Sequence, residues 1–264
     1  MRARLDQHFL KDPAVRDRIL AAARLGSGDS VVEIGPGRGF LTGELLRRAP
    51  VVAVEMDERL ADAMRLELGG APDFRLIASD FLKVEPAELG RPPLKFVANL
   101  PYSVAAPILQ RILSWDCWSL AVLMFQKEVA ARILAGPGCR DYGVLAISVA
   151  VKAEAELVTL APPAAFVPRP KVDSAVVALR RRQAPLVGPQ DEGAFFRVVR
   201  AAFSQRRKTV VHPLAASLAM GRGIVGAALE ACGIPASARA EEIPPEAFLR
   251  LAAELTDRTP GTIL

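Results

Sequence analysis

Short apolar runs alternate with helix-like segments between about residues 30 and 155. The runs are Ser30–Ile34, Val51–Glu55, Phe74–Ala78, Leu94–Ala98, Leu120–Phe125 and Val144–Val151. Between them, apolar residues recur at every third or fourth position over Leu41–Ala49, Glu58–Leu68, Ala105–Ser114 and Lys127–Ala135. Strands that alternate with helices predict an α/β fold, with a doubly wound, mostly parallel, Rossmann-like sheet covered by helices on both faces.

The pattern changes after a proline-rich stretch that contains Ala161–Pro163 and Val167–Pro170. Proline restricts its own backbone and that of the preceding residue, so this stretch predicts an extended connector. One more strand is expected at Ser174–Leu179. Helical spacing then follows over Glu192–Ser204, Thr209–Ala219, Gly226–Cys232 and Pro245–Leu255. We therefore predict an α/β domain over residues 1–185 and a smaller helical domain over residues 186–264.

Composition narrows the class of protein. The chain has 264 residues, of which 51% are hydrophobic and 24% charged, as is typical of a globular protein. Its apolar runs are far shorter than the roughly 20 residues of a membrane span. The three cysteines are scattered and only two histidines are present, which argues against disulfides and metal. We expect a cytoplasmic protein, a monomer, whose chemistry uses no metal and no membrane.

The positive charge is concentrated in one segment. Residues 1–164 carry 20 basic and 20 acidic side chains, whereas residues 165–210 carry ten basic and three acidic ones. A neutral N-terminal part followed by one basic segment is typical of a protein that binds a polyanion such as RNA. The alternative is that these arginines are solvated helix faces.

A glycine-rich loop follows the first strand of this pattern. It reads Glu-Ile-Gly-Pro-Gly-Arg-Gly over residues 33–39, and glycines let a ligand approach the backbone closely. Glu55 ends the second strand, where a carboxylate can accept both hydroxyls of a ribose. Asp80 follows the third strand and can read an adenine amine. Either acid could instead be a helix N-cap, but three such sites after successive strands favour a nucleoside-containing cofactor.

The fourth strand leads into Asn99, Leu100, Pro101 and Tyr102. The exocyclic amine of adenine is a poor nucleophile, because its lone pair is delocalised into the ring. The Asn99 side-chain oxygen and the Leu100 carbonyl can accept its N–H groups, and Tyr102 offers a face for stacking. The alternative is an ordinary strand–turn–helix in which Tyr102 covers the core. The loop favours methylation of adenine or a similar base.

Motifs along nearly the whole chain resemble the ribosomal RNA adenine dimethyltransferase family, especially its small-subunit (16S) branch. These motifs are Gln7–Leu10, Glu33–Gly39, Glu55, Asp80, Asn99–Tyr102, Phe125–Ala130, Tyr142–Gly143, Phe166–Ser174, Phe203 and Arg206–Thr209. The resemblance implies N6,N6-dimethylation of two adjacent adenosines near the 3′ end of 16S ribosomal RNA, with a role in assembly of the small subunit. It implies S-adenosyl-L-methionine as the cofactor.

The same resemblance implies roles for individual residues. Those expected to bind the cofactor are His8, Leu10, Gly35, Gly37, Glu55, Asp80 and Asn99. The segment Gln7–Leu10 is expected to fold over it. Those expected to meet the target base are Asn99, Leu100, Tyr102 and Phe203, and those expected to bind RNA are Arg206, Arg207 and Lys208.

Two other interpretations stay open. The chain could be an RNA-binding assembly factor without transfer activity, or a large-subunit (23S) adenine methyltransferase. The intact Asn99–Tyr102 loop favours an enzyme over a binder. Leu100, together with the Gln126–Glu128 and Arg206–Thr209 runs, favours the small-subunit branch.

Overall fold

The structure is a computed structural model that describes residues 7–205 and 207–258. It contains two compact units, each described here by itself. The sheet unit comprises residues 1–130 and 154–181, and the helical unit comprises residues 131–153 and 182–264.

The strands follow the predicted order, with additions. They are β1 (Phe9–Leu10), β2 (Ser30–Ile34), β3 (Val51–Glu55), β4 (Phe74–Ala78), β5 (Leu94–Asn99), β6 (Trp118–Gln126), β7 (Ala153–Ala161), β8 (Phe166–Val167) and β9 (Ser174–Arg181). Most of the central strands are buried on both faces, which is why their sequences are continuous apolar runs.

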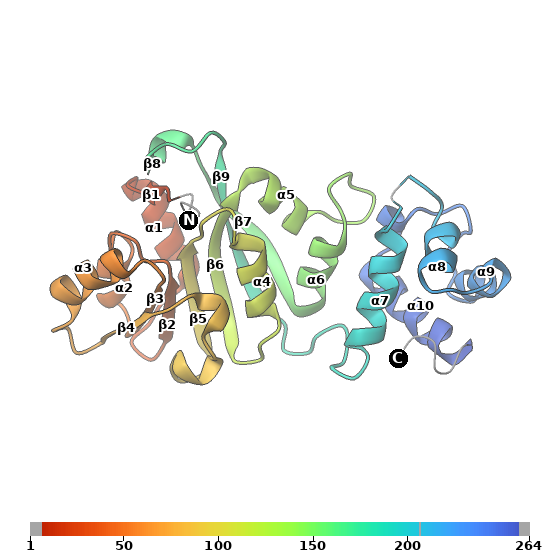
Figure 1. Cartoon of the computed structure of the whole chain (residues 1–264), viewed down its shortest axis with the longest axis horizontal. Helices are drawn as coiled ribbons and strands as arrows, with labels where there is room; N and C mark the ends of the chain where they lie inside the picture. Colours follow the sequence, from red (N-terminus) through yellow and green to blue (C-terminus); the bar gives the residue numbers. More distant parts are fainter. Residues whose placement is uncertain (1–6, 206, 259–264) are drawn as a thin grey trace. The chain divides into compact units, whose positions relative to one another are not determined.

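A seven-stranded sheet with the order β4-β3-β2-β5-β6-β9-β7 forms the centre of the sheet unit (Figure 1). The strands from β4 to β6 pair in parallel, and β9 pairs antiparallel with β6. The chain runs outward from β2 to β4 and then returns to place β5 on the other side of β2. This reversal is a topological switch point, where doubly wound sheets bind ligands beyond the carboxyl ends of their strands.

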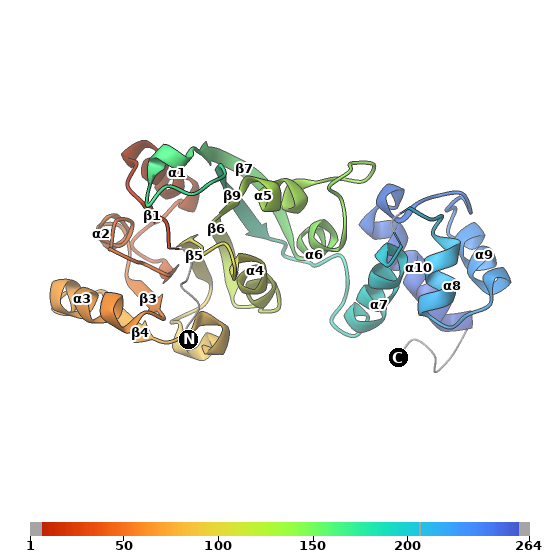
Figure 2. The same ribbon diagram turned by 45° about the horizontal axis from the view of Figure 1, so that its top comes forward.

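Helices flank the sheet on both faces, as predicted (Figures 1 and 2). The helices before the connector are α1 (Pro13–Ala23), α2 (Thr42–Leu46), α3 (Glu58–Leu68), α4 (Ala105–Leu113) and α5 (Lys127–Leu134), and a further one, α6 (Val144–Lys152), belongs to the helical unit. Short 3-10 turns are η1 (Phe81–Lys83), η2 (Pro86–Glu88), η3 (Pro163–Ala165) and η4 (Ala240–Glu242). The α/β prediction for this part of the chain is confirmed.

Helix α1 was not anticipated from the sequence, although its start carries a clear signal. The Asp12 carboxylate accepts hydrogen bonds from the backbone N–H groups of Ala14 and Val15, and Pro13 occupies the first helical position. Aspartate before proline is a favoured way to begin a helix, because proline needs no hydrogen-bond acceptor there. The buried face of α1 packs on the sheet through Val15 and Ile19.

The strand predicted at Val144–Val151 is wrong, because this segment forms helix α6. Its residues are almost uniformly apolar, and Ala146, Ile147, Val149 and Val151 are all buried. A short segment that is apolar all round has no period to separate a buried helix from a buried strand. The strand nearby is β7, whose charged and exposed residues concealed it in the sequence.

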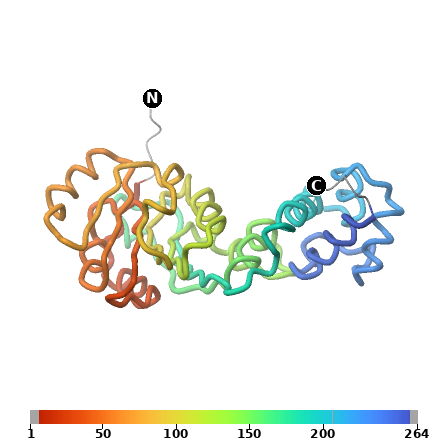
Figure 3. The backbone as a smooth tube through the Cα atoms, turned by 90° about the horizontal axis from the view of Figure 1, so that it is seen from below, coloured from red at the N-terminus to blue at the C-terminus, as the bar shows by residue number. Residues whose placement is uncertain are grey.

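The helical unit combines α6 with α7 (Glu192–Phe203), α8 (Val211–Ser217), α9 (Arg222–Ala231) and α10 (Pro245–Arg258). Figure 3 shows the segment that contains α6 beside α7. Residues of α6, α7 and α10 share one apolar core, which includes Ile147, Phe195 and Phe248. The compact units therefore divide the chain differently from the predicted boundary at residue 185, because residues 131–153 pack with the C-terminal helices. Over the described residues, no helix is both long enough and apolar enough to span a bilayer.

Candidate active site

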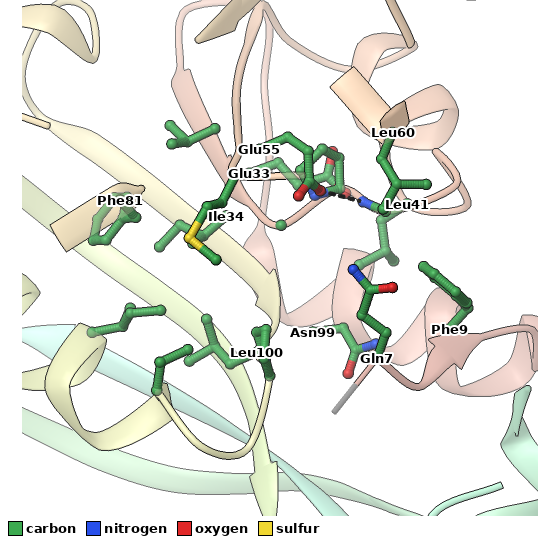
Figure 4. Close-up of a pocket in the computed structure, with 18 of the residues that line it drawn as sticks. Gln7, Phe9, Glu33, Ile34, Leu41, Glu55, Leu60, Phe81, Asn99 and Leu100 are labelled. Atoms are coloured by element: carbon green, nitrogen blue, oxygen red, sulfur yellow. Dashed lines mark hydrogen bonds between the residues drawn. The ribbon is translucent and has the colours of Figure 1, made fainter. Parts of the chain in front are cut away.

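A cavity of about 280 Å³ lies at the switch point, beyond the carboxyl ends of β2 to β5 (Figure 4). Nine residues expected at the site line it together: His8, Leu10, Gly35, Gly37, Glu55, Asp80, Asn99, Leu100 and Tyr102. They come from the N-terminal segment and from the ends of four different strands. The sheet topology thus brings together residues that lie far apart in the sequence.

The glycine loop leaves β2 with a backbone that other residues rarely adopt. Gly35 and Gly37 have φ angles of +66° and +60°. A Cβ atom at Gly37 would lie 3.0 Å from two ring carbons of Phe9, whereas a Cβ atom at Gly35 would meet no atom within 4 Å. Glycine at position 37 therefore lets the N-terminal segment pack directly on the loop.

Glu55, at the end of β3, holds the glycine loop in place. Its two carboxylate oxygens accept hydrogen bonds from the backbone N–H groups of Gly37, at 3.2 Å, and Asp57, at 2.9 Å. Burial raises the pKa of Glu55, and these backbone donors oppose that rise. The carboxylate is 6% exposed and lines the cavity, so its remaining acceptor positions can serve a ligand.

Glu33, at the end of β2, is a site residue that the sequence did not single out. It is 1% exposed and lines the cavity, and its Oε2 atom has no hydrogen-bond partner within the described part of the chain. The pKa of Glu33 is raised to about 8, because burial and the nearby Glu55 raise it by more than the Thr42 hydroxyl lowers it. A buried carboxyl oxygen without a partner in a cavity lining points to a ligand that would complete its hydrogen bonding.

Asp80 is an N-cap residue and also lines the cavity. Its Oδ1 accepts a hydrogen bond from the Leu82 N–H, at 3.0 Å, and so caps the 3-10 turn η1. The same side chain lines the cavity. The neighbouring Phe81 is 4% exposed and packs edge-on against Phe96, so one edge of the cavity rests on the core.

The loop after β5 supplies the polar atoms of the opposite wall. The Asn99 side-chain N–H group donates to the His8 carbonyl oxygen at 2.8 Å. Because this bond uses the amide nitrogen, the other hydrogen-bonding atom of the side chain is the acceptor Oδ1. Leu100 is 2% exposed, and Tyr102 is partly exposed where it lines the cavity.

The N-terminal segment lies across this wall. Strand β1 pairs antiparallel with β8, with Phe9 opposite Val167 and Leu10 opposite Phe166. His8 Nδ1 lies 2.8 Å from the Pro168 carbonyl oxygen. The Arg38 guanidinium sits over the Phe9 ring, 4.6 Å from its centre. The segment that the resemblance expected near the cofactor is therefore attached to the glycine loop, the connector and Asn99.

Phe203, Arg207 and Lys208 are not among the residues that line this cavity. Phe203 lies in the helical unit, where its ring contacts Tyr142 and Phe248 at centre distances of 6.1 and 6.0 Å. Arg207 and Lys208 are exposed, and Arg206 lies outside the described residues. The role of Phe203 at the target base and the RNA-binding role of residues 206–208 stay predictions.

Part of the basic segment is engaged within the protein. Arg180 forms an ion pair with Glu156, and Arg181 forms one with Asp116, each at 2.5 Å. Arg182 donates from Nε to the Ala150 carbonyl oxygen. The net charge of residues 165–210 therefore overstates the charge available to a polyanion, and the exposed pair Arg207 and Lys208 is the better candidate.

A sequence profile described as ribosomal RNA adenine dimethylase matches residues 1–257. The chain belongs to this family. The assignment confirms the resemblance found in the motifs and identifies the chain as a methyltransferase.

Individual relatives support the family assignment. The ribosomal RNA small subunit methyltransferase A of Moorella thermoacetica is 44% identical over 262 residues, which cover 94% of this chain and 90% of that protein. The enzyme of the same name from Dehalococcoides mccartyi is 42% identical over 254 residues, covering 95% and 87%.

Solved structures share the fold over nearly the whole chain. The crystal structure of a dimethyladenosine transferase from Plasmodium falciparum has a TM-score of 0.84 and 28% identity, covering 95% of this chain and 98% of that one. The 23S rRNA methyltransferase ErmE has a TM-score of 0.74 and 32% identity, covering 94% and 99%. The predicted fold class, including the helical C-terminal part, is confirmed.

Proposed function

We propose that this chain uses S-adenosylmethionine to add two methyl groups to N6 of each of two adjacent adenosines near the 3′ end of 16S ribosomal RNA. The observation that carries the proposal is the meeting, in one cavity, of the glycine loop, Glu55 and Asp80 with the Asn99–Tyr102 loop. The relatives at 42–44% identity are named small subunit methyltransferases, which favours 16S over 23S RNA. We propose that it acts as a monomer in the cytoplasm and contributes to assembly of the small subunit.

The residues of the cavity fit S-adenosylmethionine. Open space beside Gly35 leaves the loop backbone accessible to a ligand. Two buried carboxyl groups, Glu33 and Glu55, suit a ligand that is positively charged at its sulfur and its amino group. We assign Glu55 to the ribose hydroxyls and Asp80 to the adenine amine, with Gly35 and Gly37 beside the methionine part.

The protein's part in the reaction is to prepare the amine. S-adenosylmethionine supplies an activated methyl group when it is bound. Asn99 Oδ1 and the Leu100 carbonyl oxygen accept the two N–H groups of the adenine amine, which draws its lone pair out of conjugation with the ring. Tyr102 offers the base a stacking face. The nitrogen becomes cationic on methylation and loses its proton readily, so no strong general base is needed.

Substituting Gly37 with alanine should weaken cofactor binding more than substituting Gly35. Both variants carry the strain of a positive φ angle, which costs on the order of 1 kcal/mol. Only the new Cβ at position 37 also meets the Phe9 ring, which must shift by a few tenths of an ångström and so disturbs the packing of the N-terminal segment on the loop. Calorimetric titration with S-adenosylmethionine measures both affinities. Equal losses would show that the packing of Phe9 on the loop does not contribute to binding.

Replacing Arg206, Arg207 and Lys208 with alanine should weaken binding of small-subunit RNA and flatten its salt dependence. Each lost phosphate contact lowers the slope of log K against log salt by about one unit. The matched control replaces Arg47 and Arg65, which are exposed and each pair with a neighbouring carboxylate. Filter binding across a salt series gives the slopes. A slope unchanged from that of the control would place residues 206–208 away from the RNA.

The choice of RNA is tested with a labelled methyl donor. Purified small and large ribosomal subunits that lack adenine dimethylation are offered in parallel, and the label in each RNA is counted. We expect label in 16S RNA alone. Label in 23S RNA would support the activity named for ErmE, and binding of cofactor without label in either RNA would support an assembly factor.

A further inference from the structure

Tyr102, the stacking residue of the proposed function, is tied to the central sheet by a buried serine. The Ser174 hydroxyl oxygen lies 2.6 Å from the phenol oxygen of Tyr102, and either can donate the hydrogen bond. Ser174 is 0% exposed and is the first residue of β9. It lies opposite Gln126 in the β6–β9 ladder, so it belongs to a rigid element. The phenol is therefore fixed to the sheet and not only to its own loop.

A second contact holds the same ring from another side. The imidazole of His8 lies 5.5 Å from the Tyr102 ring centre, with an angle of 36° between the planes. His8 is itself placed by the Pro168 carbonyl oxygen, 2.8 Å from its Nδ1. Both contacts trace back to residues 168–174, which run from the residue after β8 to the first residue of β9. This segment thus sets the position of a side chain some seventy residues earlier in the sequence.

We propose that Ser174 is a positioning residue for methyl transfer, which holds the Tyr102 ring in the orientation that receives the target base. The proposal rests on the proposed function, because it assumes that a base stacks on Tyr102. Ser174 is fully buried and is not among the residues that line the cavity, so we assign it a role through Tyr102 and not a direct contact with the reactants.

The hydrogen bond has a physical reason to matter for binding. A free aromatic side chain must be ordered when a base stacks on it, whereas a ring already held at its hydroxyl has lost that freedom beforehand. Ordering one side chain weakens binding by about three- to tenfold. Burial also raises the pKa of Tyr102, so the phenol stays a neutral hydroxyl that can either donate or accept in this contact.

A double-mutant cycle tests the role. Ser174→Ala and Tyr102→Phe each break the same hydrogen bond, and the second keeps the stacking ring. We expect each to lower kcat/KM for small-subunit RNA by about three- to tenfold, and the double variant to lose no more than the larger single loss. The Kd for S-adenosylmethionine should not change. Ser148→Ala, which removes a buried hydroxyl bonded to the Val144 carbonyl in α6, is the matched control and should leave both values unchanged.

Two results would overturn the positioning role. Losses that multiply in the double variant would mean that the two hydroxyls act independently. A Ser174→Ala variant whose cofactor affinity falls as far as its kcat/KM would show a general structural defect.

The contact can also be measured without any turnover. The chain has two tyrosines, Tyr102 and Tyr142, so carbon-13 at Cζ of tyrosine gives two NMR signals, which Tyr102→Phe assigns. We expect Ser174→Ala to shift the Tyr102 signal and to leave that of Tyr142 unchanged. No shift would overturn the contact itself, whether or not the chain methylates RNA. A shift in a protein that transfers no methyl group would instead overturn the proposed function, and the positioning role with it.

Discussion

Replacing Asn99 with alanine should lower the rate of methyl transfer by at least about a hundredfold, because it removes a preorganised acceptor for the target amine. The expectation rests on the place of Asn99 at the end of β5 and on its amide orientation. The bond from its nitrogen to the His8 carbonyl oxygen leaves Oδ1 as the acceptor. Single-turnover transfer at saturating cofactor and RNA measures the chemical step.

Cofactor affinity should fall only modestly in the same variant. Alanine leaves the His8 carbonyl without its donor, which loosens one of several attachments of the N-terminal segment, while β1 still pairs with β8. Asn99→Asp is the informative comparison, since it keeps an acceptor but cannot donate to His8. It should transfer faster than the alanine variant and more slowly than the unchanged chain. If Asn99→Ala transfers within about tenfold of the unchanged chain, Asn99 is not the amine acceptor.

Replacing Glu33 with glutamine should stabilise the free protein near neutral pH by on the order of 3 kcal/mol. The Glu33 carboxyl has its ordinary pKa of 4.5 in the unfolded chain and a pKa of about 8 when folded. Below the lower pKa it is protonated in both states and has no effect. As pH rises between the two values, the unfolded chain ionises while the folded protein must keep the proton, so unfolding becomes easier. Glutamine cannot ionise and removes this cost.

Thermal unfolding at about pH 4 and about pH 7 checks the direction of this change in stability. The melting temperature of Glu33→Gln should exceed that of the unchanged chain at the higher pH and match it at the lower. Glu44→Gln is the control, because Glu44 is partly exposed and its ion pair with Arg48 lowers the pKa of Glu44. Glu44→Gln should lower the melting temperature only slightly. A Glu33→Gln variant that is less stable near neutral pH would mean that the carboxylate is stabilised in the free protein.

Glu33→Gln should also weaken binding of S-adenosylmethionine. The Glu33 carboxyl would then lower the stability of the free protein while it favours binding of the cofactor. A buried carboxyl without a partner is costly in the free protein and is retained where a ligand can use it.

The parts of this molecule that sequence reasoning found are those governed by local pattern. The central strands were predictable because buried parallel strands are continuous apolar runs. Once the strands were predicted, the polar residues at their carboxyl ends, Glu55, Asp80 and Asn99, could be picked out as site candidates. Helix α6 was misread because a fully buried apolar segment has no distinguishing period. Strand β7 was missed because its charged residues interrupt the apolar pattern.

The parts that it missed are pairings between distant residues. Ser174 and Tyr102 are 72 residues apart, and His8 and Asn99 are 91 apart, yet each pair shares a hydrogen bond. Glu33 belongs to the glycine-loop motif, but only the fold shows that its carboxyl is buried without a partner. Such contacts depend on sheet order and on the course of the connector, which no local spacing encodes.

Identification of the methylated nucleoside is the most direct test of the proposal that the residues of this cavity direct methyl transfer to the exocyclic amine of adenosine. Small-subunit RNA lacking adenine dimethylation is incubated with the protein and S-adenosylmethionine, digested to nucleosides and examined by mass spectrometry. We expect N6,N6-dimethyladenosine, the product of the proposed function, which Asn99→Ala should fail to produce. Methyl groups on ribose or on a base carbon, or no methylated adenosine from a protein that binds its cofactor, would contradict it.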